Sequence, residues 1–265
     1  MHEQLISDWI GRNVPRARLD EGGRLWHGGD PAGEYAALTE AVALLPVITH
    51  AQLLAEGPDA IDYLHRRLTQ SIRTLEVGRG AHALLLGGDG RMQADMCLWL
   101  GADSAMLVTP RSQAESAFEL LDRYILMDQL ELTRFWLNEP MVMLAGPRAP
   151  ALIGGLMDPR PRAESLADGW SGWLSVNVAG LPCRVLGDER FRVPVYHVSM
   201  PPMAAGQLLN ALAGAVREAG GAVAGEAAFE RLRIKSGVTQ FGRDTDERTI
   251  PLEARMLNAI SFDKG

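Results

Sequence analysis

The stretch that decides the fold is Phe229–Gly265, which reads FERLRIKSGVTQFGRDTDERTIPLEARMLNAISFDKG. Apolar and charged residues alternate in its LRIK segment, and this period of two predicts a short strand with Arg233 on one face, followed by a turn at Gly237. Arg233 is therefore a candidate anion ligand. Pro251 is well suited to the first position of a helix, so a helix is expected to begin there.

A second informative stretch, Gly57–Leu100, contains a hairpin signal. The segments AHALLLGG and RMQADMCLWLG flank an Asp-Gly pair, a strong short-range predictor of a β-hairpin. On the second strand Asp95, Cys97 and Trp99 alternate with apolar residues and share one face. A carboxylate in such a strand needs a partner, so Asp95 either belongs to a site, lies near a sheet edge, or is bonded to a neighbouring backbone amide.

An internal repeat bears on the architecture. The segments LLAEGPDAIDYL (53–64) and MVMLAGPRAPALIGGL (141–156) each read as strand, Gly-Pro turn and helix. They predict an α+β protein of two related layers, each a sheet with helices on one face. Helices are expected at about residues 34–42, 59–70, 111–124, 149–157 and 203–218, the last from its apolar periodicity.

Together these stretches resemble the folate-binding family that includes the glycine cleavage T protein (aminomethyltransferase) and the YgfZ-type proteins of iron-sulfur cluster assembly. The resemblance begins at about Tyr35 and implies the aminomethyltransferase folate-binding-like α+β fold, two interleaved sheet-plus-helix layers. Residues 1–50 and 138–225 are expected to form the first subdomain, and residues 51–137 and 226–265 the second. In YgfZ-type proteins a run like AISFDKG is normally followed by Cys-aromatic-x-Gly-Gln-Glu, so this loop and the C-terminal barrel domain are expected to be absent.

The resemblance also implies site residues. Asp95 falls where the T protein has an aspartate that lies by the folate nitrogens and is needed for aminomethyl transfer, and Trp99 falls where an aromatic residue lines the pterin site. Arg233 matches the arginine of a Leu-Arg-Ile motif, and Phe241 belongs to an aromatic-Gly pair that follows it. Glu189 is a loosely placed equivalent of the glutamate that grips the pterin.

Three functions stay open on this basis. The first is a tetrahydrofolate-binding protein of the YgfZ type, an accessory factor in iron-sulfur cluster assembly or repair, with tetrahydrofolate or a one-carbon derivative as cofactor and iron-sulfur carrier proteins as partners. The second is a tetrahydrofolate-dependent aminomethyl or methyl transferase, with Asp95 as its catalytic residue. Lys235 and Ser71 replace the family's usual glutamate and aspartate, which favours the third, a degenerate folate-free interaction scaffold.

Composition excludes several other classes. A net charge of −7 argues against nucleic acid as the main partner. The two cysteines, Cys97 and Cys183, have no spacing typical of a metal site or a disulfide framework, so no metal is expected. No apolar run reaches the length of a membrane span, and the start of the chain does not read as a signal peptide, so a soluble cytoplasmic protein is expected. His82 is expected to be a packed or surface histidine.

Overall fold

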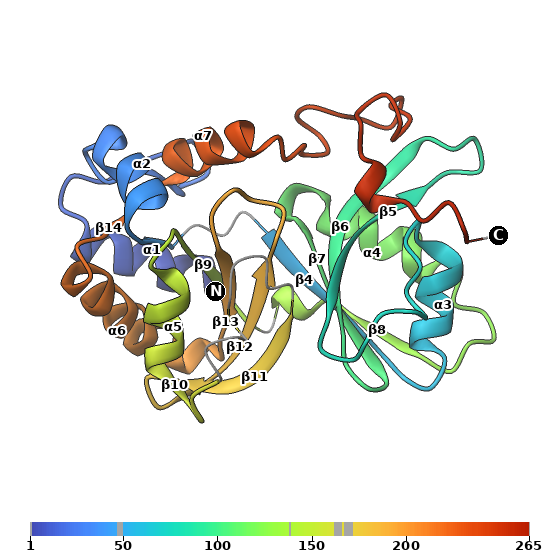
Figure 1. Cartoon of the computed structure of the whole chain (residues 1–265), viewed down its shortest axis with the longest axis horizontal. Coiled ribbons are helices and arrows are strands. Elements are labelled where there is room, and N and C mark those ends of the chain that lie inside the picture. Colours follow the sequence, from blue (N-terminus) through green and yellow to red (C-terminus); the bar gives the residue numbers. More distant parts are fainter. Residues whose placement is uncertain (1, 47–49, 138, 162–165, 167–171, 265) are drawn as a thin grey trace. The chain divides into compact units, whose positions relative to one another are not determined.

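The computed structural model describes residues 2–46, 50–137, 139–161, 166 and 172–264 (Figure 1). The chain has a mixed α+β fold and divides into two compact units, each made of stretches that are separated in the sequence. Unit 1 comprises Met1–Ile48, Leu137–Trp170 and Leu174–Val238, and unit 2 comprises Thr49–Trp136, Ser171–Trp173 and Thr239–Gly265. Residues 226–238, expected in the second subdomain, therefore group with unit 1.

Unit 1 is built on a seven-stranded sheet with the strand order β10-β11-β12-β13-β9-β3-β14. Only β14 runs parallel to its neighbour in the strand pairs that the structure describes here. The bounds of the strands are β3 Ala43–Leu45, β9 Met141–Ala145, β10 Met157–Asp158, β11 Trp173–Val178, β12 Leu181–Asp188, β13 Val195–Ser199 and β14 Ala222–Val223. A small separate hairpin pairs β1 Arg18–Leu19 with β2 Leu25–His27.

Helices cover both faces of this sheet, whereas the sequence predicted helices on one face only. On one face, apolar residues of α1 (His2–Asn13), α5 (Ala149–Leu156) and α6 (Ala205–Glu218) pack with the sheet in a single core cluster. On the other, α2 (Pro31–Glu40) and α7 (Glu226–Ser236) contribute to a second cluster. The second layer exists because α7, which was expected to be a strand, is a helix that buries apolar side chains on the sheet.

The strand predicted around Arg233 was wrong, and its residues lie in α7. Leu232 is 2% exposed while Ile234 is 60% exposed, so the apparent alternation is one turn of a helix with a buried and an exposed side. Gly237 ends the helix at φ +74°. The N–H of Gly237 donates to Ile234 O and that of Val238 to Arg233 O, which is the Schellman arrangement.

Glu34 holds α2 and the start of α7 in place. One of its carboxylate oxygens accepts the backbone N–H of Gly28 at 2.7 Å, and the other accepts that of Gly225 at 2.9 Å. Gly225 is the residue immediately before α7, so one buried carboxylate joins two segments that are far apart in the sequence. The two helices also pack together directly.

Unit 2 contains a five-stranded sheet with the order β5-β6-β7-β4-β8. Its strands, all antiparallel to their neighbours in the described pairs, are β4 His50–Glu56, β5 Gly80–Leu86, β6 Met92–Leu100, β7 Ser104–Pro110 and β8 Glu131–Thr133. The predicted hairpin is confirmed as β5–β6. Its turn is closed by Gly87 N donating to Arg91 O, and Gly90 adopts φ +76°.

The helices α3 (Ala60–Arg67) and α4 (Ala114–Asp122) pack on one face of this sheet. Both copies of the predicted strand-turn-helix repeat are present, as β4–α3 and β9–α5, and the glycines at their turns have φ +138° (Gly57) and +128° (Gly146). Short 3₁₀ turns also occur at Arg111–Gln113, Phe135–Leu137, Pro202–Ala204 and Leu257–Ala259.

The helix expected to begin at Pro251 was wrong. Residues 251–255 form hydrogen-bonded turns, and the first helical residues after them are the 3₁₀ turn Leu257–Ala259. Arg255 has φ +56°, a left-handed conformation that a right-handed helix cannot continue through. The Glu253 side chain still accepts the N–H of Ile250 at 3.1 Å, a side-chain-to-backbone bond typical of a helix N-terminus that here closes a turn.

Candidate functional site

Asp95 is a buried carboxylate with a histidine partner. It lies in the middle of β6 and is 2% exposed. His82 Nε2 lies 2.6 Å from Asp95 Oδ1, a separation at which a ring N–H donates to a carboxylate. Among the described residues, no side chain or backbone group donates to Asp95 Oδ2. The site therefore presents one satisfied and one available carboxylate oxygen.

The hairpin register explains why these two side chains meet. Leu84 of β5 pairs with Asp95, and His82 pairs with Cys97, so His82 and Asp95 are diagonal neighbours on one face. The expectation that His82 is merely packed or exposed missed this contact. Counting residues outward from the turn closed by Gly87 and Arg91 would have placed His82 opposite Met96 instead, because the register shifts by one residue between Leu85 and Leu86.

The face that carries Asp95 also carries other polar and aromatic groups. As predicted, Cys97 and Trp99 share it, while Met96, Leu98 and Leu100 belong to the apolar core under α3 and α4. Gln52 of β4 lies across from Val108, which in turn lies across from Cys97, so Gln52 is on this face too. Its Nε2 is buried without a hydrogen-bond partner. The face thus offers a buried donor and a buried acceptor.

Phe241 lies next to this group. It packs with Leu84, Met92, Met256 and Ala259, and Leu84 is the cross-strand partner of Asp95. The structure therefore brings three of the predicted site residues, Asp95, Trp99 and Phe241, onto or beside one sheet face of unit 2.

The other two predicted residues belong to unit 1. The Arg233 guanidinium is nearly buried and makes a two-pronged pair with Glu230, with nitrogen-oxygen distances of 2.8 and 2.7 Å. Glu189 is exposed in the turn after β12. Its neighbour Asp188, which the sequence reading did not select, is instead buried within the sheet.

Asp188 is the centre of a buried charge network in unit 1. Arg190 donates to both of its carboxylate oxygens, at 3.0 and 2.8 Å, and His197 Nε2 lies 3.3 Å from Oδ2. Burial alone would raise the pKa of Asp188, but the Arg190 charge and the hydrogen bonds from His197 and Arg190 hold that pKa well below its ordinary value. Asp188 is therefore ionised at neutral pH.

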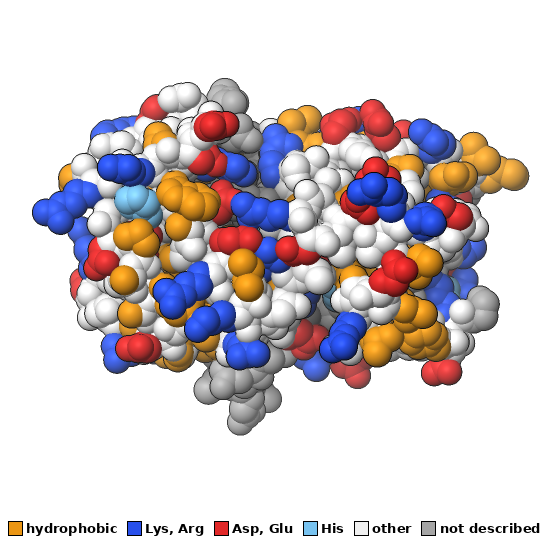
Figure 2. All heavy atoms as spheres, turned by 90° about the horizontal axis from the view of Figure 1, so that it is seen from above, with side chains coloured by type: hydrophobic (Ala, Val, Ile, Leu, Met, Phe, Trp, Pro, Cys, Tyr) orange, Lys and Arg blue, Asp and Glu red, His pale blue; other side chains and the backbone are white. Residues whose placement is uncertain are grey.

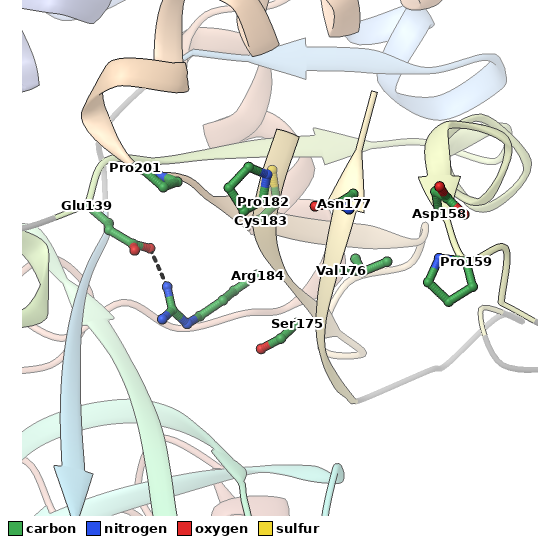
Figure 3. A pocket seen from close by; sticks show the side chains of 10 residues that line it. All are labelled: Glu139, Asp158, Pro159, Ser175, Val176, Asn177, Pro182, Cys183, Arg184 and Pro201. Carbon is green, nitrogen blue, oxygen red and sulfur yellow. Dashed lines mark hydrogen bonds and ion pairs between the residues drawn. The ribbon is translucent and has the colours of Figure 1, made fainter. Parts of the chain in front are cut away.

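A cavity of about 510 Å³ opens in unit 1 beside strands β11 and β12 (Figure 3). Arg184 and Glu139 meet along it, with a nitrogen-oxygen distance of 2.6 Å, and Ser199 donates to the same Glu139 oxygen at 2.8 Å. Cys183 is turned into the apolar core, where burial raises the pKa of its thiol to about 11. No sequence pattern indicated this cavity.

Over the described part of the chain, no group of three metal-binding side chains gathers. None of the helices described is long and apolar enough to cross a membrane. Figure 2 shows basic and acidic side chains interspersed over the face that it presents.

Comparison with known proteins places these features in a family. Residues 25–264 match the GCVT N-terminal domain. The chain is similar to the aminomethyltransferase of Halothermothrix orenii, with 25% identity over 87% of this chain and 64% of the relative. It is also similar to the aminomethyltransferase of a Thermotoga species, with 21% identity over 87% of this chain and 63% of the relative. The chain thus spans less than two thirds of these relatives.

The fold is that of a solved structure, the glycine cleavage system aminomethyltransferase T from Bartonella henselae. The TM-score is 0.81 at 19% identity, and the match covers 97% of this chain and 68% of that one. At this identity the likeness establishes the α+β fold, whereas the chemistry must be argued from the residues of this chain.

Proposed function

Because the chain belongs to the GCVT N-terminal domain family, we propose that it binds tetrahydrofolate or a one-carbon derivative of it. The observation that carries this proposal is the buried Asp95 carboxylate, held by His82 through one oxygen and open at the other. A carboxylate out of water needs hydrogen-bond donors on its remaining lone pairs, and a reduced pterin supplies N–H groups.

The residues around Asp95 fit such a ligand. Gln52 Nε2 is a buried donor without a partner, and a pterin ring carries a carbonyl oxygen that can accept from it. Trp99 and Phe241 supply aromatic surface on and beside the same face. We assign Asp95, Trp99 and Phe241 to the folate site on this basis, with His82 orienting the Asp95 carboxylate.

Arg233 and Glu189 are proposed as further folate ligands, and each would need a local change in order to act. Arg233 would reach the anionic tail of the ligand only by giving up its pair with Glu230, since both carboxylate oxygens already hold the guanidinium. Glu189 lies in an exposed turn, so a role in the site would require that turn to rearrange.

As the specific role, we propose a YgfZ-type accessory factor in iron-sulfur cluster assembly or repair. The AISFDKG run, Ala259–Gly265, supports this branch. Iron-sulfur carrier proteins would then be its partners.

The alternative is a tetrahydrofolate-dependent aminomethyl or methyl transferase, which the similarity to proteins named aminomethyltransferase favours. In that case Asp95 would accept or steer a proton of the reacting amine. The remaining alternative is a folate-free scaffold.

Calorimetric titration with 5-formyltetrahydrofolate tests the proposal. We expect saturable binding that Asp95→Asn weakens by about 1–3 kcal/mol, the range for a hydrogen bond to a charged group. Asp103→Asn is the matched control, because Asp103 lies exposed in the turn between β6 and β7 of the same unit. No binding, or equal weakening by both variants, would refute the folate site and leave the scaffold. If the chain does bind the folate, a turnover assay with a methyl or aminomethyl donor separates the transferase from the accessory factor.

A further inference from the structure

We propose that the cavity beside β11 and β12 is a second ligand site, distinct from the Asp95 face, and that it takes a small organic ammonium ion. The described residues that line it all belong to unit 1, whereas Asp95 belongs to unit 2. Its volume of about 510 Å³ falls within the usual range for small-molecule sites.

The charge balance of the cavity favours a cation. Of the described residues that line it, two carry a carboxylate, Glu139 and Asp158, and one carries a guanidinium, Arg184. Arg184 already donates to Glu139, so the Glu139 carboxylate largely neutralises the positive charge of Arg184. The remaining carboxylate charge would attract a cation and repel an organic anion.

Glu139 is held so that one oxygen stays available. Arg184 and Ser199 both donate to Oε2, at 2.6 and 2.8 Å, and none of the described residues donates to Oε1. The side chain is only 14% exposed, so its geometry is set by these two contacts before any ligand arrives. In Figure 3 the Arg184 side chain runs toward Glu139 and the two are joined by the marked ion pair. A pre-oriented carboxylate oxygen is the strongest single acceptor that an ammonium group can find here.

The rest of the wall suits the other parts of such a ligand. An ammonium group carries three N–H donors, and Ser175 and Asn177 add a hydroxyl and an amide oxygen to the acceptors on the cavity wall. Pro159, Pro182 and Pro201 supply rigid apolar surface for an alkyl group. Cys183, with its pKa raised to about 11, contributes no charge at neutral pH.

The test is an NMR titration of the full chain at pH 7 with n-butylammonium chloride, recording backbone amide shifts. The amine is protonated at this pH, as a lysine side chain is. Sodium butyrate and sodium chloride at equal ionic strength are the matched probes. We expect saturable shifts with butylammonium alone, concentrated at Ser175, Asn177 and Arg184. Equal shifts with butyrate, or shifts elsewhere in the chain, would overturn the proposal.

Variants separate a built site from general attraction to an acidic protein. Glu139→Gln should weaken butylammonium binding at least tenfold, since it removes the charge of the anchoring oxygen. Asp158→Asn changes an exposed residue and should weaken binding about threefold with the fold intact, which keeps the test valid if Glu139→Gln unfolds. Glu218→Gln, an exposed carboxylate at the end of α6, is the control and should leave the affinity unchanged. An effect of Glu218→Gln equal to that of Asp158→Asn would refute the site.

Discussion

Replacing Arg190 by alanine should destabilise unit 1 strongly, because the change leaves the Asp188 carboxylate buried without its main counter-charge. The Asp188 side chain is 1% exposed, and Arg190 contributes two of its hydrogen bonds. Breaking a buried ion pair from one side typically costs about 3–5 kcal/mol. We expect the lower end, about 3 kcal/mol, because His197 stays beside Asp188 and Arg190 is itself partly exposed.

The assay is urea unfolding at pH 7, followed by near-UV circular dichroism. Arg248→Ala is the control, since Arg248 also pairs with an aspartate two residues before it, Asp246, but on the surface, and its removal should leave the midpoint unchanged. The double variant Asp188→Asn/Arg190→Ala should be more stable than Arg190→Ala alone, because it removes the stranded charge. The reasoning would be refuted if Arg190→Ala lost as little stability as Arg248→Ala does. It would also be refuted if the double variant were no more stable than Arg190→Ala alone.

The same network sets a pH dependence. The pKa of Asp188 in the folded chain lies below the ordinary value of about 3.9 that applies when unfolded, so the unfolded state binds the proton first as pH falls. The stabilisation is therefore complete above about pH 4–5 and is lost progressively below it. In Arg190→Ala the folded-state pKa rises toward or above the unfolded value, so the acid-side loss of stability should be shallower than in the parent chain.

Two further predictions concern the turns and the thiols. Gly146→Ala should lower the free energy of unfolding by at least about 1–3 kcal/mol, because φ is +128° there and a Cβ would lie 2.6 Å from Ala41 O. Gly214→Ala, in open space on α6, should raise it by about 0.5–1 kcal/mol. Urea midpoints that move in the same direction would contradict this. In a Cys97→Ser background, Cys183 should react with a thiol reagent at pH 8 about a hundredfold more slowly in the folded chain than in the urea-unfolded chain, because burial raises the pKa of its thiol to about 11. Equal reaction rates in the two states would contradict this.

Local sequence determined which residues of β6 share a face in the candidate site of unit 2. The Asp-Gly turn determines the β5–β6 hairpin, and strand alternation puts Asp95, Cys97 and Trp99 on one face, whereas the register shift between Leu85 and Leu86 that brings His82 to Asp95 has no such local signal. The two Gly-Pro turns likewise determined the strand-turn-helix repeats, because glycine alone adopts their positive φ without strain. In each case the deciding interactions lie within a few residues of one another, so they can be read from the chain.

Two features of unit 1, the helix α7 and the Glu139–Arg184 pair, were decided only by tertiary structure. LRIK reads as a strand locally, but burial of Leu232 against the sheet and the glycine that ends α7 made it a helix. Glu139 and Arg184 are 45 residues apart, and no periodicity relates them until β13 pairs with both β12 and β9. A local pattern specifies which side chains share a face, but the partner that neutralises a buried charge is chosen by whichever distant strand or helix packs beside it.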